Sequence, residues 1–301
     1  QAIANGWKII KIRWIDINKG DDETPIYRSR AVGKEFNDEA INGLFAGTPP
    51  LEALRSLVSE AGTISENGDT TEEKVMMIND VARAVFEAKA TRKVCIELSD
   101  EDKTPEDVRQ DNVGLLQMSL YGTRDAATNW QERVAKEMIA WGFSRGRYNP
   151  CLYFQKATGL KTLVHGDDFV SVGNRSAVIL SRRKLEKTFK IKTKVVGTGP
   201  EESRGGKVLN RVTRVIDDGW EYEPDQRHAE ISTAELGLQD AGPAATPGED
   251  EKKWEYEDNA IRLSSEILSR FCSIAARIKY LVADSPDIMY SAKEACRLMA
   301  N

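Results

Sequence analysis

Three carboxylates stand out because each lies at the end of a short apolar run. Asp80 follows residues 75–78, and the pair Asp167 and Asp168 separates residues 163–164 from residues 169–172. Carboxylates at neighbouring strand ends can bind hard divalent cations, which prefer oxygen ligands. Two such cations about 4 Å apart stabilise the attacking and leaving oxygens of a phosphoryl transfer. The spacing therefore raises the hypothesis of two-metal phosphoryl-transfer chemistry.

The pattern alone leaves simpler interpretations open. Asp-Asp pairs occur at 21–22, 167–168 and 217–218, and aspartate beside glycine is common in turns. Asp80 could also be the N-cap of a helix that starts at Val81, because a capping carboxylate accepts hydrogen bonds from the first turn. Turn and capping roles therefore compete with metal binding at this stage.

Other common kinds of site find little support in the sequence. The four cysteines form no Cys-x-x-Cys pair, which argues against a structural zinc site. Only two histidines are present, so a site built on several histidines is excluded. The sequence contains no nucleophile-elbow motif of the form Gly-x-Ser-x-Gly and neither of the glycine-rich phosphate-binding loops.

The composition is that of an ordinary globular protein. The chain has 301 residues, a net charge of −5, 40% hydrophobic residues and 30% charged residues. No apolar run approaches the ~20 residues that a membrane span needs, so we expect no membrane partner. Scattered cysteines in a chain of this length predict a reducing compartment.

The elements that must hold the acids can be outlined from periodicity and turn residues. In the first half we expect strands, helices and one acidic loop. The strands are at 9–15, 27–32, 75–78 and 94–98; the helices are at 51–61, stopped by Gly62, and at 81–90; the loop is at 100–112.

In the second half, a helix at 126–141 precedes two strands, 151–154 and 162–164. The next strand, 169–172, would form a hairpin with Asp167 and Asp168 at its tip. Further expectations are a helix at 175–189, a loop at 197–206, a hairpin at 208–223, a linker at 241–252, a helix over 267–281 and another after Pro286. This irregular order of strands and helices predicts an α+β fold.

Five blocks in order resemble the reverse transcriptase of copia-type LTR retrotransposon Pol polyproteins, and the resemblance covers nearly the whole chain. The tail at 277–288 resembles the segment that follows the polymerase core in that family. The blocks are Tyr-Arg-Ser-Arg-Ala-Val-Gly-Lys-Glu-Phe at 27–36, Phe-Ala-Gly-Thr-Pro-Pro-Leu-Glu at 45–52, Asn-Asp-Val-Ala-Arg-Ala at 79–84, Leu-Tyr-Gly at 120–122 with Trp130, and Val-His-Gly-Asp-Asp-Phe-Val at 164–170.

The resemblance implies a right-hand polymerase of fingers, palm and thumb, with an antiparallel palm sheet. Fingers and palm would be interleaved over residues 1–200, with palm strands around 75–98 and 151–172. Residues 201–250 would form a thumb-like, primer-grip region, and residues 251–301 a helical connection. The chain would be one domain of a longer polyprotein.

The resemblance also implies the chemistry. Asp80, Asp167 and Asp168 would hold two Mg²⁺ ions, and a primer 3′-hydroxyl would attack the α-phosphate of a deoxynucleoside triphosphate. The basic fingers strand of the family falls on Arg28, Arg30 and Lys34. These cations would offset the charge of the triphosphate, unless they lie on an exposed, solvated strand edge.

Seven cations between residues 182 and 194 would lie beside the palm and could follow the phosphates of template or primer. The alternative is a solvated helix face. The global charge of −5 does not itself favour a nucleic-acid surface.

Several positions depart from the family pattern. Val85 replaces the aromatic residue that excludes the ribonucleotide 2′-hydroxyl, so either Phe86 takes over that role or sugar discrimination is loosened. His165 and Gly166 replace Tyr-Val, and we expect His165 to be a packing or template-side residue. Asp125 stands where the family usually has Gln. Two alternatives therefore stay open: a decayed element copy that only binds nucleic acid, and another two-metal phosphotransferase or nuclease that uses the acids of residues 100–111.

The partners implied are an RNA template, a DNA or RNA primer and a deoxynucleoside triphosphate. Other polyprotein domains, RNase H and integrase, are expected outside this chain. The resemblance implies a cytoplasmic location in a virus-like particle, with a nuclear location as the alternative.

Overall fold

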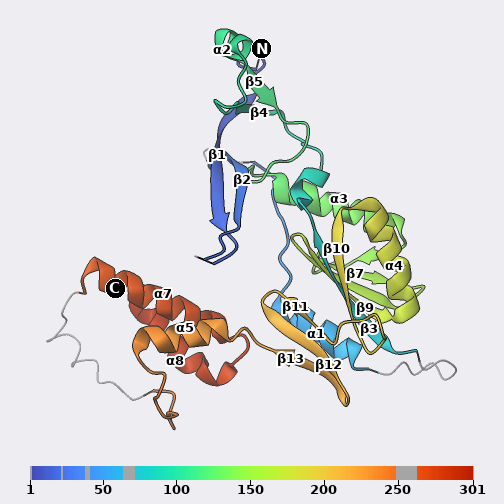
Figure 1. Cartoon of the computed structure of the whole chain (residues 1–301), viewed down its shortest axis with the longest axis vertical. Helices are drawn as coiled ribbons and strands as arrows, with labels where there is room; N and C mark the ends of the chain where they lie inside the picture. Colours follow the sequence, from blue (N-terminus) through green and yellow to red (C-terminus); the bar gives the residue numbers. More distant parts are fainter. Residues whose placement is uncertain (1, 22, 38–40, 64–71, 249–262, 301) are drawn as a thin grey trace. The chain divides into compact units, whose positions relative to one another are not determined.

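The computed structural model describes residues 2–21, 23–37, 41–63, 72–248 and 263–300 (Figure 1). The chain divides into two units. The first comprises residues 1–206 and 215–220, and the second comprises residues 207–214 and 221–301. Each unit is described by itself. No helix of the described ranges has the length and apolar character needed to cross a membrane.

The first unit begins with a four-stranded sheet in the order β2-β1-β4-β5. Strand β1 (Lys8–Asn18) pairs antiparallel with β2 (Tyr27–Lys34) and parallel with β4 (Val94–Glu97). Strand β5 (Val113–Leu115) closes the sheet beside β4. The two strands expected in residues 7–45 are therefore confirmed, and Asn18 fixes their connection by accepting hydrogen bonds from the backbone of Gly20 and Ile26.

The acidic stretch at 100–112 is not the plain loop that was expected. It contains helix α2 (Pro105–Gln110), which starts with a capping box between Thr104 and Asp107. Each of these side chains accepts a hydrogen bond from the backbone of the other, and this satisfies two of the free N–H groups at the helix start. Capping at its N-terminus therefore stabilises a short helix in this stretch, although its many charges had indicated a loop.

A six-stranded sheet in the order β10-β3-β9-β8-β7-β6 forms the centre of the first unit. Every pair of neighbouring strands in it is antiparallel. The strands are β3 (Lys74–Val81), β6 (Ser144–Arg145), β7 (Leu152–Gln155), β8 (Leu160–His165), β9 (Asp168–Asn174) and β10 (Ile191–Val196).

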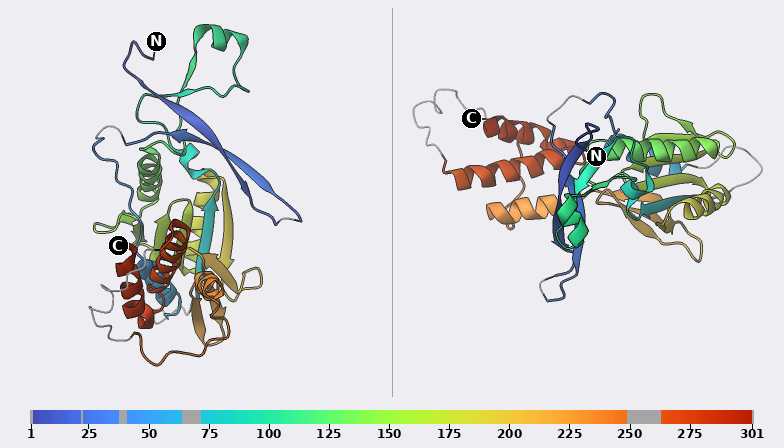
Figure 2. Two further views of the ribbon diagram at one scale, coloured as in Figure 1. Left: turned by 90° about the vertical axis from the view of Figure 1, so that its left-hand side faces the viewer. Right: turned by 90° about the horizontal axis from the view of Figure 1, so that it is seen from above.

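The two faces of this sheet are covered differently (Figures 1 and 2). Helices α3 (Ala126–Ala140) and α4 (Arg175–Thr188) share an apolar core with one face, which we call the helix face. Its core includes Trp130, Phe169 and Phe189. Helix α1 (Leu51–Ala61) packs against β9, β3 and β8 on the other face, which we call the open face. On β3, residues 76, 78 and 80 belong to the open face, because side chains alternate along a strand.

The chain beyond β3 differs from the helix expected at 81–90. Val81 still belongs to the strand, Arg83 takes a left-handed conformation with φ of 58°, and only a short 3₁₀ turn, Ala84–Glu87, follows. The backbone then pairs with residues 117–119, where the N–H of Ser119 donates to the carbonyl of Ala88. These longer-range hydrogen bonds use backbone groups that a helix would have needed.

A buried ionic cluster joins β2 to the start of α3. Glu35 has a fully buried side chain and accepts two hydrogen bonds from Arg92, at 2.8 Å each. Arg92 also donates to Asp125 at 2.6 Å. Asp125 is therefore paired with Arg92. Next to this cluster, Gly33 donates its N–H to the Tyr121 carbonyl, and a Cβ on Gly122 would collide with the Gly33 backbone.

In the described part of the second unit there are three α-helices, namely α5 (Arg227–Leu236), α7 (Ser265–Leu281) and α8 (Met289–Arg297). The last two confirm the expected C-terminal helices, and α5 was not predicted. A small sheet has its residues divided between the two units; its strands are β11 (Gly205–Val208), β12 (Arg211–Ile216) and β13 (Gly219–Glu223). The expected linker at 241–252 has no helix or strand up to residue 248, and its last four residues lie outside the described part.

Candidate functional site

The register of the central sheet brings the three predicted acids together. Asp80 near the end of β3 is the direct partner of Asp168 at the start of β9. Directly opposed residues of antiparallel strands have Cα atoms about 4.5–5.5 Å apart, and Asp167 is the next residue along the chain. Asp80 and Asp167 are exposed, and Asp168 is half-buried. Asp80 and Asp167, 87 residues apart in the sequence, thus lie at one end of the inner strands of the central sheet.

A two-residue turn, Gly166 and Asp167, connects β8 to β9. Gly166 has a φ of +60°, a conformation that glycine adopts without steric cost. Two hydrogen bonds fix this turn: the indole Nε1 of Trp130 donates to the Gly166 carbonyl at 2.6 Å, and the N–H of Val81 donates to the Asp167 carbonyl at 2.9 Å. The backbone that carries Asp167 is therefore held by both α3 and β3.

The acids repel one another. Burial, followed by the charges of Asp167 and Asp80, raises the pKa of Asp168 to about 6. A cation bound beside these acids would stabilise the ionised carboxylate of Asp168 and lower its pKa again. Hard divalent cations suit this donor set, which consists of carboxylate oxygens only.

The side chains as they lie do not yet form a cation cage. Among the described residues, no three carboxylate, histidine or cysteine side chains are arranged to hold a metal ion. The backbone places Asp80 directly opposite Asp168 and next to the turn that carries Asp167. The donor set fits Mg²⁺ in chemical type.

The acids belong to a row that crosses four strands. Lys192 on β10 is the direct partner of Asp80, and His165 on β8 is the direct partner of Asp168. In the described part of the chain the Nδ1 of His165 is buried without a hydrogen-bond partner. The cross-strand order is thus lysine, aspartate, aspartate, histidine.

A cavity of about 230 Å³ adjoins Asp167, and neither Asp80 nor Asp168 lines it. Asp167, His165 and Val85 line it together with Tyr121 and Trp130. Residues 46–48 form part of its wall and are held by Gln131. The side chain of Gln131 accepts a hydrogen bond from the N–H of Gly47 and donates one to the Gly47 carbonyl.

The neighbouring Phe86 does not line this cavity. It is 38% exposed and packs edge-on against Tyr121, with ring centroids 5.5 Å apart. The smaller Val85, and not the aromatic Phe86, therefore faces the cavity.

One of the three predicted strand cations reaches the cavity wall. The Arg30 guanidinium stacks over the Tyr121 ring at 4.5 Å, and Tyr121 lines the cavity. Arg28 and Lys34 are exposed on the same strand. Only Arg30 is thus connected to the cavity by a contact of the described residues.

Two features missed from the sequence are the Trp130 hydrogen bond and the position of Lys192. The resemblance includes Trp130, but neither its periodicity nor its neighbours in the sequence indicate a hydrogen bond to the turn. The alternation of Ile191, Thr193 and Val195 with lysines was the signal that could have predicted β10.

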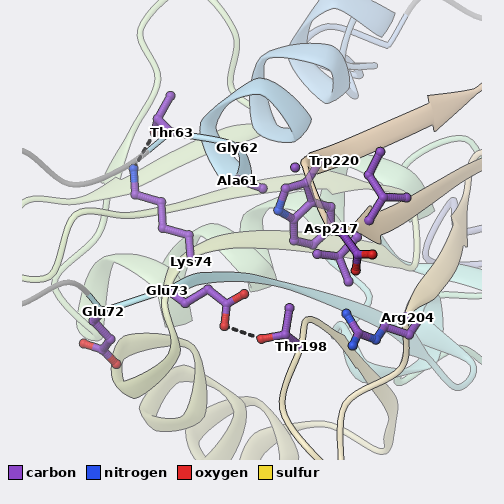
Figure 3. A pocket seen from close by; sticks show the side chains of 13 residues that line it. Ala61, Gly62, Thr63, Glu72, Glu73, Lys74, Thr198, Arg204, Asp217 and Trp220 are labelled. Carbon is purple, nitrogen blue, oxygen red and sulfur yellow. Dashed lines mark hydrogen bonds between the residues drawn. The ribbon is translucent and has the colours of Figure 1, made fainter.

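A larger cavity of about 520 Å³ lies at the opposite end of β3 (Figure 3). Lys74 in its wall is six residues before Asp80, or roughly 20 Å along the strand. Several of its polar groups are bonded to one another: Lys74 donates to Thr63, and Thr198 donates to Glu73. This cavity therefore does not belong to the acidic site.

The acids of residues 100–111 lie in the connection between β4 and β5 of the N-terminal sheet. They are not part of the central sheet that carries Asp80 and Asp168. The interpretation that draws further metal ligands from this stretch therefore gains no support.

One comparison with known proteins finds a distant sequence relative. No protein-family model matches the chain. The chain is 21% identical over 256 residues to the retrovirus-related Pol polyprotein from transposon TNT 1-94 of Nicotiana tabacum, a match that covers 81% of this chain and 18% of that polyprotein.

A solved structure of apo telomerase from Candida tropicalis, truncated from its C-terminal domain, covers 72% of this chain and 55% of that one. Its 11% identity and TM-score of 0.35 are too low to support an argument. The sequence similarity to the tobacco polyprotein links this chain to part of a retrotransposon Pol polyprotein.

Proposed function

We propose that the chain is an RNA-directed DNA polymerase of a copia-type retroelement, with a right-hand arrangement of fingers, palm and thumb. The observation that carries this proposal is the pairing of Asp80 with Asp168 across β3 and β9, next to Asp167 in the turn. The distant similarity to a retrotransposon Pol polyprotein supports the same conclusion.

In this proposal, Asp80, Asp167 and Asp168 hold two Mg²⁺ ions. The bound ions would supply positive charge for the phosphate oxygens on which charge develops. The protein's own contribution is the fixed turn. Trp130 and Val81 hold the backbone at residues 166–167, so that the acids stay together at one end of strands β3 and β9.

The cavity beside Asp167 would take the incoming deoxynucleoside triphosphate. Arg30, stacked on Tyr121, would hold that ring in the cavity wall and add positive charge near the phosphates. Because Val85 and not Phe86 lines this cavity, the proposal includes loosened discrimination against ribonucleotides. The partners would be an RNA template and a DNA or RNA primer, and the reaction would extend the primer.

Primer extension by wild type and by Asp167→Asn tests the proposal. The variant removes one charge in an exposed turn and should abolish Mg²⁺-dependent extension on an RNA template while the thermal midpoint is kept. Asp218→Asn is the matched control, because Asp218 is an exposed aspartate in the turn between β12 and β13. It should extend primers like wild type.

Extension that persists in Asp167→Asn would reject the polymerase assignment. Template binding without nucleotide incorporation by the wild-type chain would select the other candidate, a decayed copy that only binds nucleic acid.

A further inference from the structure

The basic run at 182–194 is divided between two sides of the central sheet. Helix α4 lies on the helix face, so its exposed cations Arg183 and Lys187 point into solvent on that side. Strand β10 follows and forms one edge of the sheet. The run is therefore not one surface, and only part of it can adjoin the acids.

Alternation along β10 separates apolar from basic side chains. Ile191 and Val195 pack against the core of the helix face, and Thr193 accepts a hydrogen bond from the buried Asn79 at 3.0 Å. Lys192 and Lys194 therefore belong to the open face. Both are exposed.

Lys190 extends this alternation by one step. It precedes β10, but its carbonyl accepts a hydrogen bond from the N–H of Ala82 at 2.8 Å, so pairing with the chain after β3 continues. Lys190 is also exposed. Three lysines at every second position thus form a stripe, about 7 Å between neighbours, along the edge of the sheet.

The stripe runs directly past the acids. Its middle member, Lys192, is the cross-strand partner of Asp80. Among the described residues, the ammonium group of Lys192 has no hydrogen bond or ion pair, and Lys194 makes one long hydrogen bond of 3.3 Å to the Gly205 carbonyl. These cations are thus available to a ligand that carries evenly spaced negative charges.

We propose that Lys190, Lys192 and Lys194 bind the phosphodiester backbone of the nucleic-acid strand whose 3′ end lies at Asp80 and Asp168. This inference rests on the proposed function in taking nucleic acid as the ligand. Spaced phosphates match spaced lysines, and cations beside the acids offset the repulsion between the carboxylates and the approaching strand.

The test is the binding of a fluorescently labelled primer–template to the full chain, measured by anisotropy over a range of salt concentrations without Mg²⁺ or nucleotide. The variant is the triple change Lys190→Gln, Lys192→Gln and Lys194→Gln. Its plot of log K against log salt should be less steep by about 2 to 3, near one unit for each lost phosphate contact, and its affinity should fall by about tenfold or more.

A control variant removes three charges elsewhere: Arg183→Gln, Lys187→Gln and Lys136→Gln. These residues are exposed on α4 and α3, over the helix face. The control should keep the wild-type salt slope. An equal loss in both variants, or no loss in the stripe variant, would overturn the inference.

A second measurement modifies the primer and compares its binding to wild type and to the stripe variant. Single methylphosphonate linkages neutralise one primer phosphate at a time. Neutralisation near the 3′ end should weaken binding to wild type and have little effect on the stripe variant. Equal losses at all positions, or in both proteins, would contradict a stripe that contacts this strand.

The two proposals fail differently. Stripe-dependent binding without any primer extension would reject the polymerase and keep the binding surface. Normal extension by wild type, with a stripe variant that binds like wild type, would reject the binding surface and keep the polymerase.

Discussion

At the scale of single residues, the pKa of Asp168 reflects the negative charge that gathers at the site. Its carboxyl is half-buried and lies between two other acids, and these surroundings raise its pKa to about 6. The ordinary value of 3.8 applies to the unfolded chain. The folded protein therefore holds this proton more tightly than the unfolded chain does, and ionisation of Asp168 works against folding.

We predict that Asp168→Asn stabilises the metal-free protein above pH 6. Below about pH 4, Asp168 is protonated in both folded and unfolded states, so the variant gains nothing. As the pH rises from 4 to 6, the unfolded chain ionises first and wild type loses stability relative to the variant. The gain should level off above pH 6 at on the order of 1 kcal/mol, after allowance for solvent screening.

Thermal denaturation of both proteins between pH 4 and pH 8, without divalent cations, measures this difference. Asp218→Asn serves again as the control and should show no such pH-dependent gain. A variant that is destabilised at pH 8 would contradict the repulsion argument.

At the scale of secondary-structure elements, helix α3 holds the turn that carries Asp167. Trp130 is 3% exposed and packs against Phe169 and Phe189, with ring centroids 6.5 and 5.4 Å away. From this position its indole N–H reaches the Gly166 carbonyl. Trp130 is therefore a positioning residue under the proposed function, since it acts on Asp167 through the backbone.

We predict that Trp130→Phe lowers kcat for primer extension and leaves KM for the primer–template unchanged. Phenylalanine keeps an aromatic ring in the core and removes the N–H donor, and the loss of one such hydrogen bond costs about 1 kcal/mol. Trp141→Phe is the matched control, because Trp141 packs against the same core. It should leave kcat unchanged at a comparable loss of stability. Equal effects of the two substitutions on kcat would mean that Trp130 only fills space.

The sequence predicted those elements whose signals are local. Residues 75–78 lie within β3, and Gly62 follows the last residue of α1. The expected hairpin between β8 and β9 is present, but its turn lies at residues 166–167, so Asp168 is the first residue of β9 and not part of the tip. Helix α2 was not expected, because the density of acidic residues at 100–112 is typical of a solvated loop and conceals the capping residues Thr104 and Asp107. The resemblance implied that the three acids share one site, but the residues alone do not give their adjacency, because it depends on the pairing of β3 with β9, which joins residues far apart in the chain.

The position of Lys192 beside Asp80 was not predicted for the same reason. It depends on which strand flanks β3, and strand order is set by packing over the whole sheet. The hydrogen bond of Trp130 likewise depends on where α3 crosses the hairpin. Residues that belong to the motifs could therefore be predicted to share a site, whereas neighbours that no motif marks, such as Lys192, could not.

At the scale of the whole molecule, the chain passes between its two units several times, at residues 206–207, 214–215 and 220–221. The second unit therefore combines a segment of β12 with the C-terminal helices. A buried ion pair joins these parts: Arg211 on β12 contacts Asp284, which follows α7, at 2.8 Å, and their side chains are only 6% and 2% exposed. Tyr280 accepts a further hydrogen bond from Arg211.

We predict that Arg211→Met destabilises the second unit by about 3–5 kcal/mol, because Asp284 loses its cation while it stays buried. The double change Arg211→Met and Asp284→Leu should recover much of this loss, since no unpaired charge remains. Hydrogen exchange by mass spectrometry can separate the units. Exchange in Arg211→Met should rise in α5, α7 and α8, whereas β3 and β9, which carry the acids, should stay protected as in wild type. Faster exchange in β3 and β9 to the same extent would show that the two units unfold as one cooperative block, and that the acidic site depends on this ion pair for its stability.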